Sequence, residues 1–429
     1  MWAACYLACL RPAQPGGATN PQDQVSSKHT MAAAGASGGG AVTAALAEHA
    51  SSASPQSSAL SSERTRVAVL GGGAWGTALA LHAARMGHDV LLWALEPEVK
   101  RAVNEEHENT VFLKGFKLPA SLRASNDIKE VAAWGEIILM VIPTPFVERT
   151  VSQVVDSVLD TSILVSCTKG ILNDTLETPN EILKRVLPAR LHPRLAYLSG
   201  PSFAAEVAKE IPTAVTVAAE DDGVAQRVQE MMSTPRFRCY RTHDVAGVEL
   251  GGALKNVLAI ACGISDGLGF GSNGRAALIT RGLDEITRLA VATGASPLTL
   301  AGLSGIGDIV LTCTGDLSRN RTVGIRLGKG EKLEAITATM GGAVAEGVLT
   351  SRSAHHLALK KGIDCPVISG IYQVIHEGAD PVDVVTQNMS RPLKPEVDHR
   401  VAQAAHQAEM PAAPNGDGAT ALPGCTINC

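Results

Sequence analysis

The chain has 429 residues, enough for more than one domain with its own buried core, and its 45% hydrophobic and 18% charged content is ordinary for a globular protein. The net charge of −5 and the isoelectric point near 6.2 exclude a strongly basic surface, so we expect neither nucleic acid nor an anionic membrane as a partner. No run of 18 or more apolar residues is present, so no membrane-spanning helix is predicted.

The nine cysteines do not indicate a disulfide framework. They are scattered, without Cys-x-x-Cys and without the Cys/His spacing of a zinc site. Each end of the chain carries one Cys-x-x-x-Cys pair, which we interpret as coincidence, with redox pairing as the alternative. We therefore expect reduced thiols, a reducing compartment and no bound metal.

Residues 1–60 differ in composition from the rest of the chain. They are rich in Ala, Ser, Gly and Pro, have only Asp23 and Glu48 as acids, and show no sustained apolar periodicity, so we expect disorder. Scarce acids with abundant Ser and Ala are typical of a transit peptide, here one for the plastid stroma. The alternative is a disordered extension of a cytoplasmic protein. Residues 409–429, rich in Ala, Pro and Gly, are expected to be a disordered tail.

The first structured element is a strand at 67–70 that leads into Gly-x-Gly-x-x-Gly at Gly71, Gly73 and Gly76, followed by a helix to Met86. The first glycine permits a tight turn, the second lets backbone approach a pyrophosphate, and the third lets the helix pack close to the strand. The free N–H groups at the helix start attract phosphate. The pattern predicts dinucleotide binding; the alternative is a Gly-rich turn in some other α/β domain.

A second strand is predicted at 89–93, and the residues after it normally set ribose specificity. Leu95 and Glu96 offer no base for a 2′-phosphate, which favours NAD, with NADP as the alternative. Glu96 can also be read as an acid at a helix start, because Pro97 follows it.

The rest of the first half predicts a doubly wound α/β sheet over residues 61–243. Residues 99–120 are expected to be helix and loop. Further strands are predicted at 136–142, 162–167, 195–198, 213–218 and 237–240, with a helix near 222–233.

Ligands of such sheets bind beyond the carboxyl ends of the strands, where three candidates fall. Phe146 follows the strand at 136–142 and either covers a cofactor ring or packs in the protein. Lys169 follows the next strand and either meets an anionic ligand or lies on the surface. Ser202 lies in a turn, 199–204, that offers free backbone N–H groups before a helix.

From Asp244 strand signals stop, and helical periodicity predicts an all-α domain over 244–408. Two glycines inside the apolar stretch 248–262 cost about 1 kcal/mol each relative to Ala, which suggests close approach by another element. Lys255 lies there in apolar company. Burial would lower its pKa and allow proton exchange near neutral pH, whereas snorkelling to solvent is the alternative.

Three later patterns add polar groups. Asp308 ends the run Gly-Ile-Gly-Asp, and Ser318, Arg319 and Asn320 open a helix, a position that favours a phosphate. Glu346 is an acid flanked by glycine in a helix-rich region and is a weak signal by itself.

Together these patterns resemble NAD(P)-dependent glycerol-3-phosphate dehydrogenase of the bacterial and plastid type, over about residues 64–400. Seven blocks in family order carry the resemblance: Gly-Gly-Gly-Ala-Trp-Gly-Thr-Ala at 71–78, Thr-Lys-Gly at 168–170, Ser-Gly-Pro-Ser-Phe-Ala at 199–204, Ala-Leu-Lys-Asn at 253–256, Gly-Ile-Gly-Asp at 305–308, Ser-Arg-Asn-Arg at 318–321 and Val-Ala-Glu-Gly at 344–347.

The resemblance implies roles for the matching positions. Lys255 would donate and accept the proton, with Lys169 and Asp308 as its catalytic partners. Besides the three glycines, the resemblance implies these cofactor contacts: Ala74, Trp75, Phe146, Lys169, Ala204, Arg319, Val344 and Glu346. As substrate contacts it implies Lys169, Gly200, Ser202, Lys255, Asp308, Ser318, Arg319 and Asn320.

The reaction that the resemblance implies is reversible hydride transfer between NAD(P)H and dihydroxyacetone phosphate, giving sn-glycerol 3-phosphate, and we also expect a homodimer. Bacterial-type members usually carry Arg or His where this chain has Leu95, which adds to the preference for NAD. Two rival interpretations are a β-hydroxyacid or 6-phosphogluconate type dehydrogenase and a non-catalytic NAD-binding protein. In the first rival family Lys and Asn are one helical turn apart, whereas Lys255 and Asn256 are adjacent.

Overall fold

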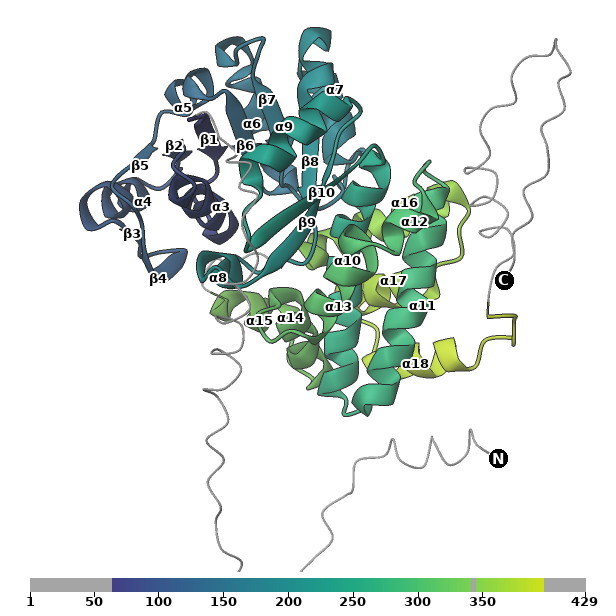
Figure 1. Ribbon diagram of the computed structural model, residues 1–429. Coiled ribbons are helices and arrows are strands. Elements are labelled where there is room, and N and C mark those ends of the chain that lie inside the picture. Colours follow the sequence, from purple (N-terminus) through teal and green to yellow (C-terminus); the bar gives the residue numbers. More distant parts are fainter. Residues whose placement is uncertain (1–63, 341–344, 397–429) are drawn as a thin grey trace, which may run out of the picture. The chain divides into compact units, whose positions relative to one another are not determined.

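Buried apolar strands form one eight-stranded sheet in the computed structural model, which describes residues 64–340 and 345–396 (Figure 1). The expected leader, the expected tail and Val344 lie outside the described residues. The strands are β1 (Arg66–Leu70), β2 (Asp89–Trp93), β5 (Leu122–Ser125), β6 (Ile137–Met140), β7 (Ile163–Ser166), β8 (Leu195–Ser199), β9 (Thr213–Ala218) and β10 (Phe237–Thr242).

The order across the sheet is β10-β9-β8-β7-β6-β1-β2-β5. All neighbours are parallel except β8 and β9, which pair antiparallel. The inner strands β1, β6 and β7 are continuous apolar runs, as expected where helices cover both faces of a parallel sheet. The predicted α/β class and the predicted strands are confirmed.

Two apolar clusters lie on the two faces of this sheet. One cluster packs under helices α3 (Ala74–Arg85), α8 (Ala204–Ala208) and α9 (Asp222–Met232). The other packs under α5 (Ile128–Trp134), α6 (Val147–Ser152) and α7 (Pro179–Val186). Short 3-10 turns, η2 (Thr144–Phe146), η3 (Val155–Ser157) and η4 (Ala189–Arg194), complete the connections.

The prediction of helix and loop over 99–120 is only partly right. Helix α4 (Pro97–Arg101) and a π-helical turn η1 (Ala102–Glu106) are followed by a hairpin of β3 (Glu108–Asn109) and β4 (Leu113–Lys117). The buried side chain of Asn109 accepts from the backbone of Phe112 at 3.0 Å and donates to the Gly72 carbonyl at 2.8 Å. The bond to Gly72, 37 residues away in the sequence, stabilises a hairpin that local propensity does not reveal.

After β10 the described chain contains helices only, as predicted (Figure 1). They are α10 (Val245–Gly267), α11 (Gly271–Val291), α12 (Pro297–Leu300), η5 (Leu303–Gly307), α13 (Asp308–Thr314), α14 (Arg319–Gly328), α15 (Leu333–Thr339), α16 (Glu346–Lys361), α17 (Pro366–Tyr372), η6 (Gln373–Glu377) and α18 (Pro381–Met389). Their apolar side chains form a third cluster centred on α10. The division into two domains at 243/244 stays a prediction, because the described residues fall in one compact unit.

Two helical stretches, Val245–Gly267 and Pro297–Thr314, are long and apolar enough to cross a membrane by length and composition alone. In α10, 94% of the apolar window is buried inside the protein, which is the situation of a core helix. The second stretch is interrupted at Gly305, whose backbone is not helical.

Helices α10 and α14 approach each other closely along facing glycines. Gly263 and Gly267 on α10 lie against Gly324 and Gly328 on α14. A Cβ on Gly324 would lie 2.1 Å from the Ile260 carbonyl oxygen, so no side chain fits there without a shift of the backbone. This packing fixes the start of α14 relative to the middle of α10.

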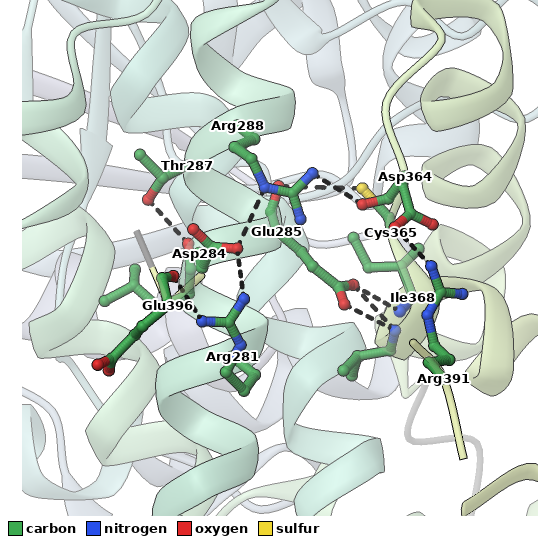
Figure 2. Close-up of polar contacts among 12 residues, drawn as sticks. Arg281, Asp284, Glu285, Thr287, Arg288, Asp364, Cys365, Ile368, Arg391 and Glu396 are labelled. Carbon is green, nitrogen blue, oxygen red and sulfur yellow. Dashed lines mark hydrogen bonds and ion pairs between the residues drawn. The ribbon is translucent and has the colours of Figure 1, made fainter. Parts of the chain in front are cut away.

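Buried polar contacts tie α11 to the start of α17 (Figure 2). The carboxylate of Glu285, which is 2% exposed, accepts from the backbone N–H groups of Val367 and Ile368 at 2.8–3.1 Å. These are N–H groups of the first turn of α17, which have no partner inside the helix. Burial raises the pKa of Glu285 to about 7.

We predict that Gly324→Ala destabilises the protein although Ala is the better helix former by about 1 kcal/mol. The new methyl group must push α14 from α10, and overpacking of this kind costs about 1–3 kcal/mol. Thermal unfolding measures the change. Gly223→Ala on α9 is the control, because the nearest atom to a Cβ there is an Asp221 side-chain oxygen at 3.1 Å. Equal melting temperatures for Gly324→Ala and the wild type would contradict the packing argument.

Candidate functional site

The carboxyl ends of four neighbouring strands bring the predicted residues to one edge of the sheet. Strands β1, β6, β7 and β8 are adjacent and parallel. The glycine turn that begins at Gly71 follows β1, Phe146 follows β6, Lys169 follows β7 and Gly200 follows β8. This edge is where open α/β sheets bind their ligands.

The three glycines of the turn differ in their surroundings as the sequence predicts. Gly71 has φ +132°, and a Cβ there would lie 2.3 Å from the Val141 carbonyl oxygen. A Cβ on Gly76 would lie 1.9 Å from the Gly71 oxygen, so only glycine allows this closeness of turn and helix. A Cβ on Gly73 would meet nothing within 4 Å. The backbone at Gly73 therefore faces open space.

The residues at this turn fit a dinucleotide. Gly73 is the N-cap of α3 and brings no side chain to the free N–H groups of the first turn, which face the open space. The indole Nε1 of Trp75 is buried without a hydrogen-bond partner among the described residues. A buried donor of this kind calls for an acceptor. Ala74, also in the first turn, is partly buried.

The central feature of the site is one carboxylate that binds two ammonium groups. Lys255 of α10 donates to Oδ1 of Asp308, and Lys169 donates to Oδ2 of Asp308 at 2.9 Å. Asp308 is fully buried and Lys255 is 7% exposed, so the expected burial of Lys255 is confirmed. The Thr312 hydroxyl donates to the Asp308 carbonyl at 2.6 Å and lies 3.4 Å from Oδ1. Two cations on one anion leave the cluster net positive.

The two lysines differ in proton affinity. Burial lowers the pKa of Lys255 to about 8; the charge of Asp308 opposes this, and the charge of Lys169 adds to it. Burial also acts to lower the pKa of Lys169, but the charge and hydrogen bond of Asp308 outweigh it, and that pKa is raised. Lys255 is therefore the ammonium that can release its proton near neutral pH, while Lys169 keeps its charge.

A chain of side-chain amides borders the cluster. Asn256 donates to the carboxylate of Glu346 at 3.3 Å and accepts from Asn320 at 3.0 Å. The oxygen of Asn320 in turn accepts from the backbone of Gly347 at 2.9 Å. These bonds join α10, α14 and the start of α16, so Asn320, expected as a substrate contact, and Glu346, expected as a cofactor contact, share one network.

Glu346 lies among the same cations. Burial raises its pKa, and the charges of Lys169, Arg319 and Lys255 oppose that rise. Glu346 is therefore brought together with the lysine pair and with the first residue of α14. Its neighbour Val344 lies outside the described residues.

The start of α14 presents an unpaired guanidinium. The Ser318 hydroxyl, at the N-cap, accepts from the backbone of Arg321 at 3.2 Å. Arg321 forms ion pairs with Asp266 and Asp316 at 2.8 and 2.9 Å. Arg319 is exposed and forms no ion pair within residues 64–340 and 345–396. An unpaired guanidinium beside the N-terminus of a ten-residue helix is suited to bind a phosphate.

The turn after β8 is tight. Gly200 has φ +144°, and a Cβ there would lie 2.9 Å from Val215 Cα. The Ser202 hydroxyl donates to the Gly200 carbonyl at 3.0 Å, and Ala204 begins the short helix α8. These residues share the sheet edge with Lys169, but no hydrogen bond joins them to the lysine cluster in the described part of the chain.

Phe146 and Leu95, which the sequence analysis placed near the cofactor, both lie at exposed positions. Phe146 is 46% exposed, and the Arg149 guanidinium lies 5.3 Å from its ring centre. Leu95, after β2, is 68% exposed. Glu96 is the N-cap of α4 with Pro97 at the first helical position, so the structural interpretation of Glu96 is confirmed.

Sequence reasoning gave no role to two residues that the cluster uses. Asn256 follows Lys255 directly, yet only the fold shows that it bridges Glu346 and Asn320. Thr312 lies four residues after Asp308, which is the spacing of neighbours on one helix face, and this signal could have found it.

Comparison with known sequences covers most of the described chain. The profile described as "NAD-dependent glycerol-3-phosphate dehydrogenase N-terminus" matches residues 66–225. The profile described as "NAD-dependent glycerol-3-phosphate dehydrogenase C-terminus" matches residues 244–386.

Curated relatives and solved structures agree with the profiles. The glycerol-3-phosphate dehydrogenase [NAD(P)+] of Citrifermentans bemidjiense is 52% identical over 331 residues, 77% of this chain and 98% of the relative. That of Syntrophotalea carbinolica is 51% identical over 332 residues, 77% of this chain and 99% of the relative. A crystal structure of glycerol-3-phosphate dehydrogenase from Coxiella burnetii has a TM-score of 0.72 and 37% identity, and covers 76% of this chain and 99% of its own.

Proposed function

The chain belongs to the NAD-dependent glycerol-3-phosphate dehydrogenase family, and we propose that Lys255 carries the proton in its reaction. The reaction is the reversible reduction of dihydroxyacetone phosphate to sn-glycerol 3-phosphate with NAD(P)H. The observation that supports the role of Lys255 is its buried ammonium, held with that of Lys169 on the single carboxylate of Asp308.

Reduction converts a ketone oxygen into an alkoxide that must be protonated. The nicotinamide, when bound, supplies the hydride. Protonated Lys255 hydrogen-bonds the ketone oxygen, stabilises the growing negative charge and then gives that oxygen its proton. Lys169 keeps its charge, adds positive potential and lowers the pKa of Lys255, so the proton is released near neutral pH. Asp308 holds both ammonium groups in position.

In the reverse direction the same atoms act in the opposite order. Neutral Lys255 accepts the proton of the C2 hydroxyl of sn-glycerol 3-phosphate as the hydride leaves. A group with a pKa of about 8 can serve both directions, because both of its protonation states are populated near neutral pH.

For the substrate phosphate we propose the start of α14. Arg319 provides a free guanidinium, and Ser318 and Asn320 flank it with a hydroxyl and an amide. Lys169, Gly200 and Ser202 are proposed to contact the rest of the substrate from the sheet edge, together with Lys255 and Asp308.

For the cofactor we propose the glycine turn, Gly71, Gly73 and Gly76, with Ala74 and Trp75 on the pyrophosphate side. The orphaned indole of Trp75 and the open space at Gly73 support this assignment. Phe146, Lys169, Ala204, Arg319, Val344 and Glu346 are proposed further contacts. Within the NAD(P) dependence of the family we propose NAD as the preferred form, because exposed Leu95 offers no charge to a 2′-phosphate.

The two rival interpretations are not supported. Both profile matches and the relatives at about half identity are glycerol-3-phosphate dehydrogenases rather than hydroxyacid dehydrogenases. A non-catalytic protein would not require the buried Lys169–Asp308–Lys255 cluster, which costs free energy to keep charged in a dry site.

The proposal also covers the location of the protein in the cell, its assembly and the limits of its domains. These two relatives match 77% of this chain but nearly all of their own length, so the remaining residues of this chain have no counterpart in them. We propose that residues 1–60 are a plastid transit peptide, because acids are scarce and Ser and Ala abundant there. We also propose that the protein forms a homodimer. We propose that each chain divides into a dinucleotide domain at 61–243 and a substrate domain at 244–408.

We predict that Lys255→Ala lowers the turnover number for dihydroxyacetone phosphate reduction by ~10²–10⁴-fold, the usual worth of a general acid. NADH binding, followed by fluorescence titration, should stay within about twofold of the wild type, because the glycine turn is untouched. NADH oxidation at 340 nm measures turnover. Full activity of this variant would remove Lys255 from its proposed role.

We predict that Arg319→Ala raises the KM for dihydroxyacetone phosphate by about 10–100-fold, the loss expected for a charge-assisted hydrogen bond of about 1.5–3 kcal/mol. The matched control is Arg326→Ala on the same helix, which removes the same charge from a surface pair with Glu331. If both variants keep the wild-type KM, the phosphate does not bind at the start of α14.

A further inference from the structure

A small cavity borders Lys169 where β7 and β8 meet α10. Its lining comes from the carboxyl ends of these strands and from the first half of the helix: Ser166, Thr168, Lys169, Tyr197, Leu198, Ser199, Val248, Glu249 and Gly252. The cavity is open because Gly252 has no side chain: a Cβ there would lie 2.5 Å from the Ser199 hydroxyl oxygen and 3.9 Å from Lys169 Cδ. The role proposed above for Lys255 makes no use of this cavity.

Two buried polar atoms of the cavity lining have no hydrogen-bond partner within the described residues. They are the hydroxyl oxygen of Ser199 and Oε2 of Glu249. Both residues are nine-tenths or more buried, Ser199 at 5% and Glu249 at 7% exposure. The cavity has room for about one water molecule, and its two unpaired polar atoms are suited to bind a buried water.

Glu249 also reaches toward the protein surface. Its other oxygen, Oε1, accepts from the backbone of Asn180 at 2.8 Å in the first turn of α7. Tyr197 donates to the Asn180 side chain at 2.8 Å. The charges of Glu181, which is exposed, and of half-buried Lys184 act on Glu249 from α7. Glu249 therefore lies between the first turn of α7 and the cavity that Lys169 also lines.

The carboxyl group of Glu249 is suited to hold a proton near neutral pH. Burial raises its pKa to about 8; hydrogen bonds from Thr178 and Asn180 oppose the rise, Glu181 adds to it, and Lys184 opposes it. Under the role proposed for Lys255, each turnover in the reducing direction removes one proton from Lys255, and that proton must be replaced before the next turnover.

We propose that Glu249 is a positioning residue that reloads the catalytic lysines with protons through a water held between Glu249, Ser199 and Lys169. This inference rests on the proposed role of Lys255. Lys169 first passes a proton to neutral Lys255, its direct neighbour on Asp308, and regains its charge by taking a proton from the water, which in turn takes the proton of the Glu249 carboxyl group. The Glu249 carboxylate then takes a proton from solvent at the start of α7, so no net charge is gained or lost over the cycle.

The test is Glu249→Gln in the full-length enzyme. Glutamine keeps the volume and can still accept from Asn180, but it cannot exchange a proton near neutral pH. The steady-state turnover number for dihydroxyacetone phosphate reduction should fall about tenfold, less than the ~10²–10⁴-fold expected when the general acid itself is removed. The single-turnover rate of NADH oxidation in stopped flow should stay at the wild-type value. Imidazole at rising concentration should restore turnover, because a diffusing acid replaces the lost one.

The matched control is Glu285→Gln (Figure 2). Glu285 is also a buried carboxylate that binds the first turn of a helix, and burial raises its pKa to about 7, but it lines no part of the cavity. The Glu285→Gln variant should keep the wild-type turnover number, and imidazole should have no effect on it. Ser199→Ala removes the second polar group proposed to bind the water, so this variant should also have a lower turnover number that imidazole restores. If Glu249→Gln does not fold, the result with Ser199→Ala decides the question.

Wild-type turnover in both Glu249→Gln and Ser199→Ala, or a loss that imidazole does not restore, would overturn the inference and leave Glu249 as a structural cap of α7. The result with Lys255→Ala keeps the two proposals apart. If that variant is inactive while Glu249→Gln behaves like Glu285→Gln, only the reloading path is wrong.

Discussion

One buried carboxylate holds the site together. Asp308 binds the ammonium groups of Lys169 and Lys255, which come from the sheet and from the core helix of the helical half. Breaking such a buried pair by removing one partner costs about 3–5 kcal/mol, so the three residues fix each other's positions. Burial lowers the pKa of Lys255, and the neighbouring charge of Lys169 adds to this effect, so one ammonium group of the cluster has the property that the proposed proton donor needs.

The rest of the fold places ligand groups around that cluster. Parallel strands β1, β6, β7 and β8 bring the glycine turn and Lys169 to one edge, and α10 carries Lys255 and Asn256 past it. The facing glycines of α10 and α14 set the free guanidinium of Arg319 at a fixed position relative to Lys255. Amide bonds through Asn256 and Asn320 add Glu346 to the same network. The residues proposed for the cofactor, the phosphate and the proton are thus parts of one connected structure.

Local patterns in the sequence predicted seven strands of the sheet, the glycine turn and the change to helices at Asp244, because apolar periodicity and glycine geometry are local properties. They did not predict β5, or the hairpin at 108–117, which the buried side chain of Asn109 connects to the distant carbonyl of Gly72. Burial of Lys255 was predicted from its apolar neighbours, but the bridging role of Asn256 and the orphaned oxygen of Glu249 depend on residues about 60–90 positions away or on a cavity. Contacts of that kind appear only when the chain is folded.

The most direct measurement of the central claim is the pH dependence of kcat/KM in both directions on one enzyme preparation. Reduction of dihydroxyacetone phosphate needs protonated Lys255, so its kcat/KM should fall as pH rises through about 8. Oxidation of sn-glycerol 3-phosphate needs neutral Lys255, so its kcat/KM should fall as pH drops through the same value. Profiles that are flat between pH 6 and 10, or that have limbs at different pH in the two directions, would contradict a single lysine as proton donor and acceptor.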